Sequence, residues 1–243
     1  MANWQDPRMT GAESIAVGVP SVARDAGLRS YMLKVYNYMA SGVLLTGIVA
    51  MLFANSGMAA QVFTGGGILP WVIILSPLAI VMAMSFGQNR MSAATLQLLF
   101  WGFAGLMGLS MSTIFLIYTG TSIAQTFFAV TAAFAGLSLY GYTTKKDLSG
   151  LGTFLIMGVV GLLVAMLVNL WLQSGAMSLA ISAIGVLLFA GLTAYDTQRI
   201  KSMYFQIQGS EMLGKAAILG ALSLYLDFIN MFQFLLAFMG DRR

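Results

Sequence analysis

The chain has 243 residues, of which 59% are hydrophobic and only 8% are charged. A soluble domain of this length carries roughly 25% charged residues, so the composition excludes an ordinary soluble fold and predicts a polytopic membrane protein. Cysteine and histidine are absent, which excludes disulfides, thiolate metal sites and histidine-based acid–base chemistry. The net charge of +4 comes from basic residues spread over short loops, and we attribute it to membrane topology rather than to nucleic-acid binding.

Two parts of the chain differ in composition. Residues 1–29 hold most of the early charges and lack a long apolar run, so we expect a mobile cytoplasmic tail without the apolar core of a cleavable signal peptide. Residues 30–243 are predicted to form one all-α domain of seven transmembrane helices joined by short loops. The predicted apolar segments are 31–54, 69–88, 93–118, 123–143, 151–172, 177–199 and 214–239.

The basic residues are divided unequally between alternate loops. Only Arg242 and Arg243 lie on the side of the C-terminus. Because positive charge favours the cytoplasmic side of a membrane, the N-terminus is predicted to be cytoplasmic. The very short loops and the absence of an organelle signal suit a bacterial inner membrane. The other ten of the 12 basic residues lie on the N-terminal side: Arg8, Arg24, Arg29, Lys34, Arg90, Lys145, Lys146, Arg199, Lys201 and Lys215.

Two aspartates stand inside apolar segments. Of the eight acidic residues, only Asp196 and Asp227 are predicted to lie within the membrane. If the last two segments form an antiparallel hairpin, the point midway between these aspartates falls between Gly209 and Gly214, which are expected turn residues. The two carboxylates are then level with each other and side by side. Ionisable groups at membrane depth are costly, so such a pair indicates a functional site.

The chemistry of two adjacent carboxylates favours proton sensing. Both cannot be ionised at low cost in a medium of low dielectric constant, so we expect Asp196 and Asp227 to share a proton and to titrate as a unit. Without protons, the same oxygens form a site that suits a hard cation such as Ca²⁺. A purely structural pair is the alternative interpretation.

Two polar residues are candidates for assisting the pair. Arg90, at the cytoplasmic end of the second segment, is a candidate latch that holds one carboxylate through a charge-assisted hydrogen bond, or else an arginine that reaches the membrane surface. Asn230 lies three residues beyond Asp227 and is predicted either to extend a polar track or to make an ordinary interhelical hydrogen bond.

At these residues the chain resembles the transmembrane Bax inhibitor motif family. The resemblance rests on Tyr195–Lys201, on Ala221–Asn230 and on the Lys-Lys-Asp-Leu-Ser sequence at 145–149. It implies a seven-helix bundle in which six helices surround a central seventh. It also implies a pH-sensitive calcium leak in which Asp196 and Asp227 sense protons, with Ca²⁺ as the permeant or bound ion and no other cofactor. Arg90 corresponds to the arginine that engages the pair in that family.

Other function classes remain open at this stage. An intramembrane aspartyl protease also places one aspartate after a tyrosine, as Tyr195-Asp196 does, but the glycines expected before the second aspartate are replaced by Leu224-Tyr225-Leu226. We therefore expect no enzyme. A proton-coupled transporter would use the pair for another solute. A membrane stress factor would instead regulate a protease or another membrane protein through helix contacts, although the sequence contains no recognisable partner motif.

The division of basic residues gives a testable topology. A reporter fused after Arg243 should read as external, because seven spans place the C-terminus opposite a cytoplasmic N-terminus. Paired alkaline phosphatase and fluorescent protein fusions measure this. A cytoplasmic reading after Arg243 would contradict the topology and the placement of the aspartates near the cytoplasmic face.

Overall fold

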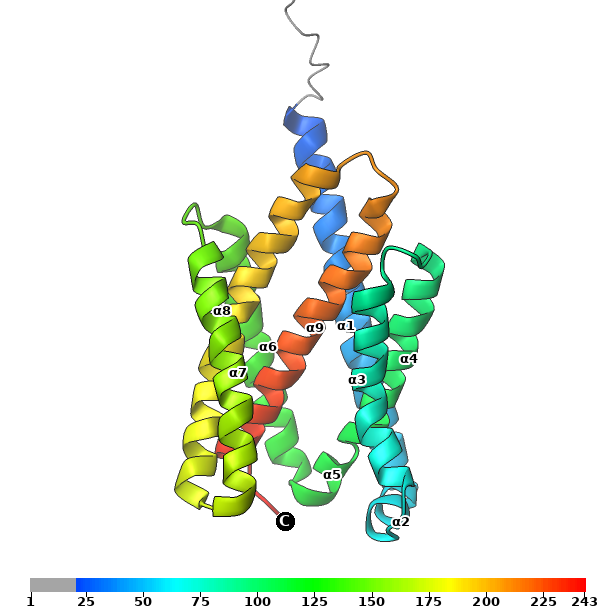
Figure 1. Ribbon diagram of the computed structural model, residues 1–243, viewed down its shortest axis with the longest axis vertical. Helices are drawn as coiled ribbons and strands as arrows, with labels where there is room; N and C mark the ends of the chain where they lie inside the picture. The colour runs from blue at the N-terminus through cyan, green and yellow to red at the C-terminus, as the bar shows by residue number, and fades with distance from the viewer. Residues whose placement is uncertain (1–20) are drawn as a thin grey trace, which may run out of the picture.

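The computed structural model describes residues 21–243, which form a bundle of helices (Figure 1). Most of the tail expected at 1–29 lies outside the described residues, and α1 already begins at Ser21, so residues 21–29 belong to a helix. The helices are α1 (Ser21–Asn55), α2 (Met58–Thr64), α3 (Leu69–Gly87), α4 (Ala93–Met111), α5 (Thr113–Ile117), α6 (Gly120–Thr143), α7 (Ser149–Leu172), α8 (Gly175–Ile207) and α9 (Met212–Met239).

The prediction of an all-α protein with seven membrane spans is confirmed. Within residues 21–243, seven helical segments are long and apolar enough to cross a bilayer, and α4 and α5 together form the third of them. The helix break between α4 and α5 is at Ser112, whose hydroxyl donates a hydrogen bond to the Leu109 carbonyl. α8 continues to Ile207, eight residues beyond the predicted end of the sixth segment.

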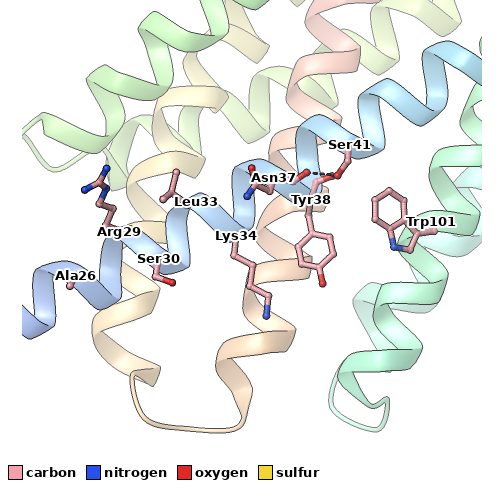
Figure 2. A pocket seen from close by; sticks show the side chains of 9 residues that line it. All are labelled: Ala26, Arg29, Ser30, Leu33, Lys34, Asn37, Tyr38, Ser41 and Trp101. Carbon is pink, nitrogen blue, oxygen red and sulfur yellow. Dashed lines mark hydrogen bonds between the residues drawn. The ribbon is translucent and has the colours of Figure 1, made fainter.

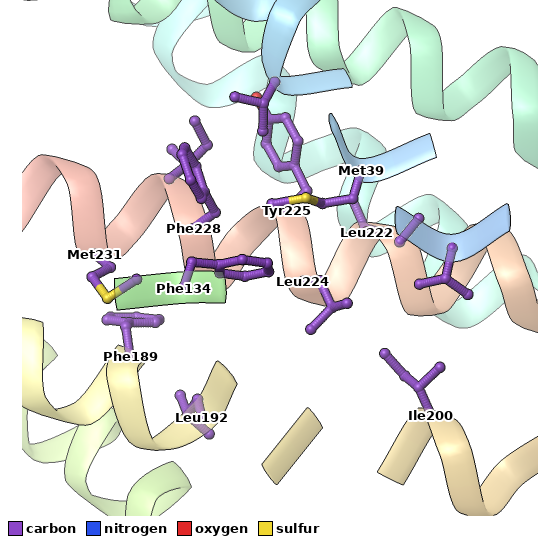
Figure 3. Close-up of a cluster of buried hydrophobic side chains, with 14 of the residues drawn as sticks. Met39, Phe134, Phe189, Leu192, Ile200, Leu222, Leu224, Tyr225, Phe228 and Met231 are labelled. Atoms are coloured by element: carbon purple, nitrogen blue, oxygen red, sulfur yellow. The ribbon is translucent and has the colours of Figure 1, made fainter. Parts of the chain in front are cut away.

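Helix α9 is the centre of the bundle, which agrees with the expected central C-terminal helix. It packs against α1, α4, α6 and α8. Its buried residues lie on all sides of the helix, which is typical of a helix enclosed by its neighbours. Figure 3 shows Tyr225 directed toward α1 and Leu224 toward α8. By contrast α3 packs mainly on α4, and α7 packs on α8.

The chain connections differ between the two ends of the bundle. At the end where α1 begins, α8 and α9 are joined by a short turn in which Gly209 has a φ of 81°, a conformation that favours glycine. At the opposite end the C-terminus pairs with the connection before α6: the Thr119 amide donates to the Asp241 carbonyl, and the Arg243 amide donates to the Ile117 carbonyl. The two chain ends of the domain therefore lie at opposite ends of the bundle, as an odd number of spans requires.

Glycines let α6 and α7 approach α8 very closely. A Cβ atom at Gly141 of α6 would collide with the backbone of Ala194, and one at Gly152 of α7 would collide with the Tyr195 ring. Small residues at helix contacts commonly allow such approach in membranes. The segment of α8 just before Asp196 is thus packed closely by two helices, by α6 against its backbone and by α7 against the Tyr195 ring.

This packing predicts unequal effects of two substitutions on α6. Gly141→Ala should destabilise the bundle by about 1–3 kcal/mol, because the added methyl meets backbone atoms that can move only with the whole helix. Gly136→Ala is the matched control, since a Cβ atom there meets nothing within 4 Å. Thermal unfolding of the detergent-solubilised protein measures both, and an equal melting temperature for the two variants would contradict the close contact.

Candidate functional site

The carboxyl group of Asp227 is enclosed in the middle of the bundle. Asp227 is 5% exposed, and its Oδ2 atom makes no hydrogen bond within the described part of the chain. Leaving a buried polar atom without a partner costs roughly 1–3 kcal/mol, and more when the group is charged. This oxygen is therefore a position at which a proton, a water molecule or a cation would be stabilising.

Asp196 faces the same interface from α8. Its side chain is 14% exposed, and its Oδ1 atom lies 3.9 Å from Nη1 of Arg199, one turn further along the helix. The Arg199 side chain is 55% exposed, so this ion pair is weak. α8 and α9, which carry Asp196 and Asp227, pack directly against each other. The structure thus brings the two predicted aspartates to one helix interface, and a proton or water shared between them stays a prediction.

A chain of hydroxyl groups links α8 to α6 and α1 next to Asp196. Thr197 donates to the Thr193 carbonyl, so its oxygen accepts from Ser138 at 2.9 Å. Ser138 in turn accepts from the Tyr36 hydroxyl at 2.6 Å. Because each hydroxyl has a single proton, the direction of donation is fixed along the whole chain, from Tyr36 to α8.

A second buried hydrogen-bond pair fixes α9 two residues before Asp227. Thr46 of α1 donates to the Ala104 carbonyl of α4 at 2.8 Å, so the Tyr225 hydroxyl donates to Thr46 at 2.6 Å. The Tyr225 ring packs edge-on against Phe103 with ring centres 5.0 Å apart. These contacts hold α9 against α1 and α4, while Asp227 is turned toward α8.

Two residues of the Tyr195–Lys201 segment hold the loop between α6 and α7. Gln198 accepts from the Leu148 amide at 2.9 Å and donates to the Lys146 carbonyl at 2.8 Å. Lys201 donates to the Tyr142 carbonyl at 2.7 Å and lies 4.8 Å from the centre of the Tyr142 ring. The two motifs noted in the sequence, at 145–149 and 195–201, are therefore one structural unit, which sequence reasoning did not foresee.

The two assisting candidates lie as follows. Arg90 is exposed in the turn after α3 and is in no ion pair with either aspartate within the described residues, so the latch role stays a prediction about another state. Asn230 is half-buried and donates to the Leu226 carbonyl of its own helix. Its place in a polar track likewise stays a prediction.

The site offers few ligands to a metal ion. Across residues 21–243, no cluster of three or more histidine, cysteine or acidic side chains is close enough to hold one. Asp196 and Asp227 would supply two carboxylates, and Ca²⁺ takes 6–8 oxygen ligands. Water and backbone or hydroxyl oxygens would have to complete the shell, so any cation here would be held weakly.

Comparison with known proteins gives consistent matches over nearly the whole chain. Residues 28–243 match the family model described as inhibitor of apoptosis-promoting Bax1. The chain is 49% identical to an uncharacterized protein of Rickettsia prowazekii, over 90% of this chain and 92% of that one. It is 46% identical to the inner membrane protein YbhL of Escherichia coli, over 90% and 94%, and 44% identical to an uncharacterized protein of Caulobacter vibrioides, over 96% of each.

The contacts of Gln198 predict a local effect on the α6–α7 loop. Gln198→Ala removes two hydrogen bonds of about 0.5–1.5 kcal/mol each, so amide hydrogens at 144–149 should exchange with solvent several-fold faster. Hydrogen exchange with mass spectrometry measures this. Gln206→Ala is the matched control because Gln206 is exposed on the same helix, and equal exchange in both variants would contradict the loop contact.

Proposed function

The chain belongs to the Bax inhibitor family of integral membrane proteins, and we propose that it is a pH-sensitive leak pathway for Ca²⁺ gated by Asp196 and Asp227. The Escherichia coli relative is an inner membrane protein, which supports the same location for this chain. The orientation that goes with this proposal has the N-terminus in the cytoplasm. The protons and Ca²⁺ are the partners of the site, and the bilayer surrounds it.

The observation that carries the proposal is that Oδ2 of Asp227, on the helix packed against the one that carries Asp196, makes no hydrogen bond within residues 21–243. With one shared proton the pair has a single negative charge, and the free oxygen gains a hydrogen bond. When that proton leaves, the two charges must separate, bind a cation or recruit a cation such as Arg90. Each outcome moves α9 relative to α8, which is the bistable element that a switch needs.

The small number of ligands supports passage rather than storage of the cation. Among the residues that the structure describes, the two carboxylates have no third acidic neighbour, so they give a weak and incomplete Ca²⁺ site. Conduction requires that an ion enter a site and also leave it readily. The candidate site therefore suits a leak better than a tight Ca²⁺-binding protein.

The rival functions receive less support from the geometry. An aspartyl protease needs room for a substrate strand next to the second aspartate, whereas Leu224 and Tyr225 are fully buried in helix contacts just before Asp227. A proton-coupled transporter typically has discontinuous helices at its site, whereas α8 and α9 run unbroken through theirs. We therefore propose a non-enzymatic protein. Regulation of another membrane protein is compatible with the exposed faces of α3 and α7, but no feature of the site favours it.

The proposal predicts the behaviour of two single variants. In proteoliposomes, Ca²⁺ flux through the wild-type chain should change with pH in the neutral range. Asp196→Asn and Asp227→Asn should each flatten that response, because the remaining carboxylate no longer has a like-charged neighbour to share a proton with. A Ca²⁺ indicator inside the vesicles, read over a series of external pH values, measures the flux.

Asp147→Asn is the matched control for these variants. Hydrogen bonds from the hydroxyl and amide of Ser149 hold the pKa of Asp147 below its usual range, so Asp147 is ionised throughout the neutral range. The contribution of the ionised Asp147 to folding stability is fully present above the ordinary aspartate pKa. It is lost only as the pH falls through the lowered pKa. A wild-type pH profile in both pair variants would reject the sensor, and strict dependence of flux on an imposed proton gradient would favour the transporter.

A further inference from the structure

A groove runs along the outside of the bundle between α1 and α6. These two helices diverge, and α9 forms the floor between them through Phe228. The groove has a volume of about 810 Å³ and is lined almost entirely by apolar side chains. The walls include Ala40 and Leu44 of α1 and Ala135 and Leu139 of α6, all exposed.

One end of this groove is cationic. Arg29 lines the end at which α1 begins, and Tyr142 lines it from α6. Lys201 sits over the Tyr142 ring, 4.8 Å from its centre. Arg29 also lines a second groove, of about 750 Å³, on the side of α1 that faces Trp101, whereas Lys34 lines only that second groove. Figure 2 shows the Arg29 and Lys34 side chains pointing to different sides of α1.

The length of the groove matches one leaflet of a bilayer. From Arg29 to Leu44 it extends 15 residues along α1, which is roughly 22 Å at about 1.5 Å per residue. The hydrocarbon of one leaflet is about 15 Å deep, and its headgroup region adds roughly 5–7 Å. An acyl chain lying in the groove would place its headgroup beside Arg29.

We propose that the α1–α6 groove binds one anionic phospholipid of the surrounding leaflet, with an acyl chain against Phe228 and the phosphate at Arg29. Arginine binds phosphate with two parallel hydrogen bonds, and it does so more strongly where water is partly excluded. This inference is independent of the proposed leak, because it rests on a surface groove and is tested by lipid binding alone.

The floor of the groove gives the bound lipid a contact with the hydroxyl chain. Tyr36 and Ser138 line the groove and hydrogen-bond to each other across it, and Ser138 continues to Thr197 beside Asp196. An acyl chain over this bridge shields it from water and holds α1 at a fixed separation from α6. The alternative occupant is a helix from a second copy of the chain. That helix would have to be apolar, match the groove in length and carry a negative charge opposite Arg29, whereas an anionic lipid has all three properties.

The test uses the full chain purified in detergent and mixed with equal amounts of phosphatidylglycerol and phosphatidylcholine. Native mass spectrometry then counts the lipids that each protein retains. The wild type should retain phosphatidylglycerol preferentially. Arg29→Gln should lower that retention about tenfold, as loss of a charge-assisted contact implies. Ala135→Trp should lower retention of both lipids by filling the groove, and Ala40→Trp repeats this from the opposite wall.

Two matched controls separate the groove from general effects. Lys34→Gln removes the same charge from the other side of α1, and Ala133→Trp adds the same bulk at an exposed position of α6 outside the groove. Both should retain lipid as the wild type does. Equal retention of the two lipids by the wild type, equal losses in Arg29→Gln and Lys34→Gln, or full retention by both groove-filling variants would each overturn the proposal. A dimer that excludes lipid from the wild type would assign the groove to a second copy instead.

Discussion

The burial of one carboxyl group on the central helix is the constraint to which the rest of the bundle is adapted. Asp227 lies among apolar side chains, and one of its oxygen atoms has no hydrogen-bond partner in the described part of the chain. Such a group is stable there only in particular protonation or binding states. The helix that carries it must therefore be held firmly by other contacts. Tyr225 provides one through Thr46, and the close packing of Phe103 provides another.

The partner helix is held by a different kind of contact. α8 is fixed to α6 and α7 by contacts at glycines, by the hydroxyl chain ending at Thr197 and by the two bonds of Gln198 to the α6–α7 loop. These groups surround Asp196 on the sides that do not face α9. The interface between α8 and α9 is consequently bordered by rigid elements, so a change of charge there acts on the separation of two helices rather than on loose side chains.

Much of this arrangement follows from sequence reasoning, for physical reasons. Long apolar runs and the cost of charge in a membrane predict the seven spans, and the spacing of Asp196 and Asp227 about a glycine turn predicts their common interface. The hydroxyl contacts were missed because Tyr36, Ser138 and Thr46 are distant in sequence, and a hydroxyl in an apolar helix can bond to its own backbone equally well. Thr193 and Thr197, four residues apart and therefore on one face of α8, were a signal that could have indicated a polar seam. The start of α1 at Ser21 was missed because charged residues at a helix end resemble a tail in composition.

The central position of α9 has a consequence for biosynthesis. The chain is made from its N-terminus, and earlier segments generally fold before later ones, yet the helix around which α1, α4, α6 and α8 pack follows all of them in the chain. Until α9 is made, the earlier spans reside in the bilayer without their common core. A nonsense mutation just before α9 would therefore delete the centre of the protein rather than its edge, leaving inserted helices for membrane proteases to clear.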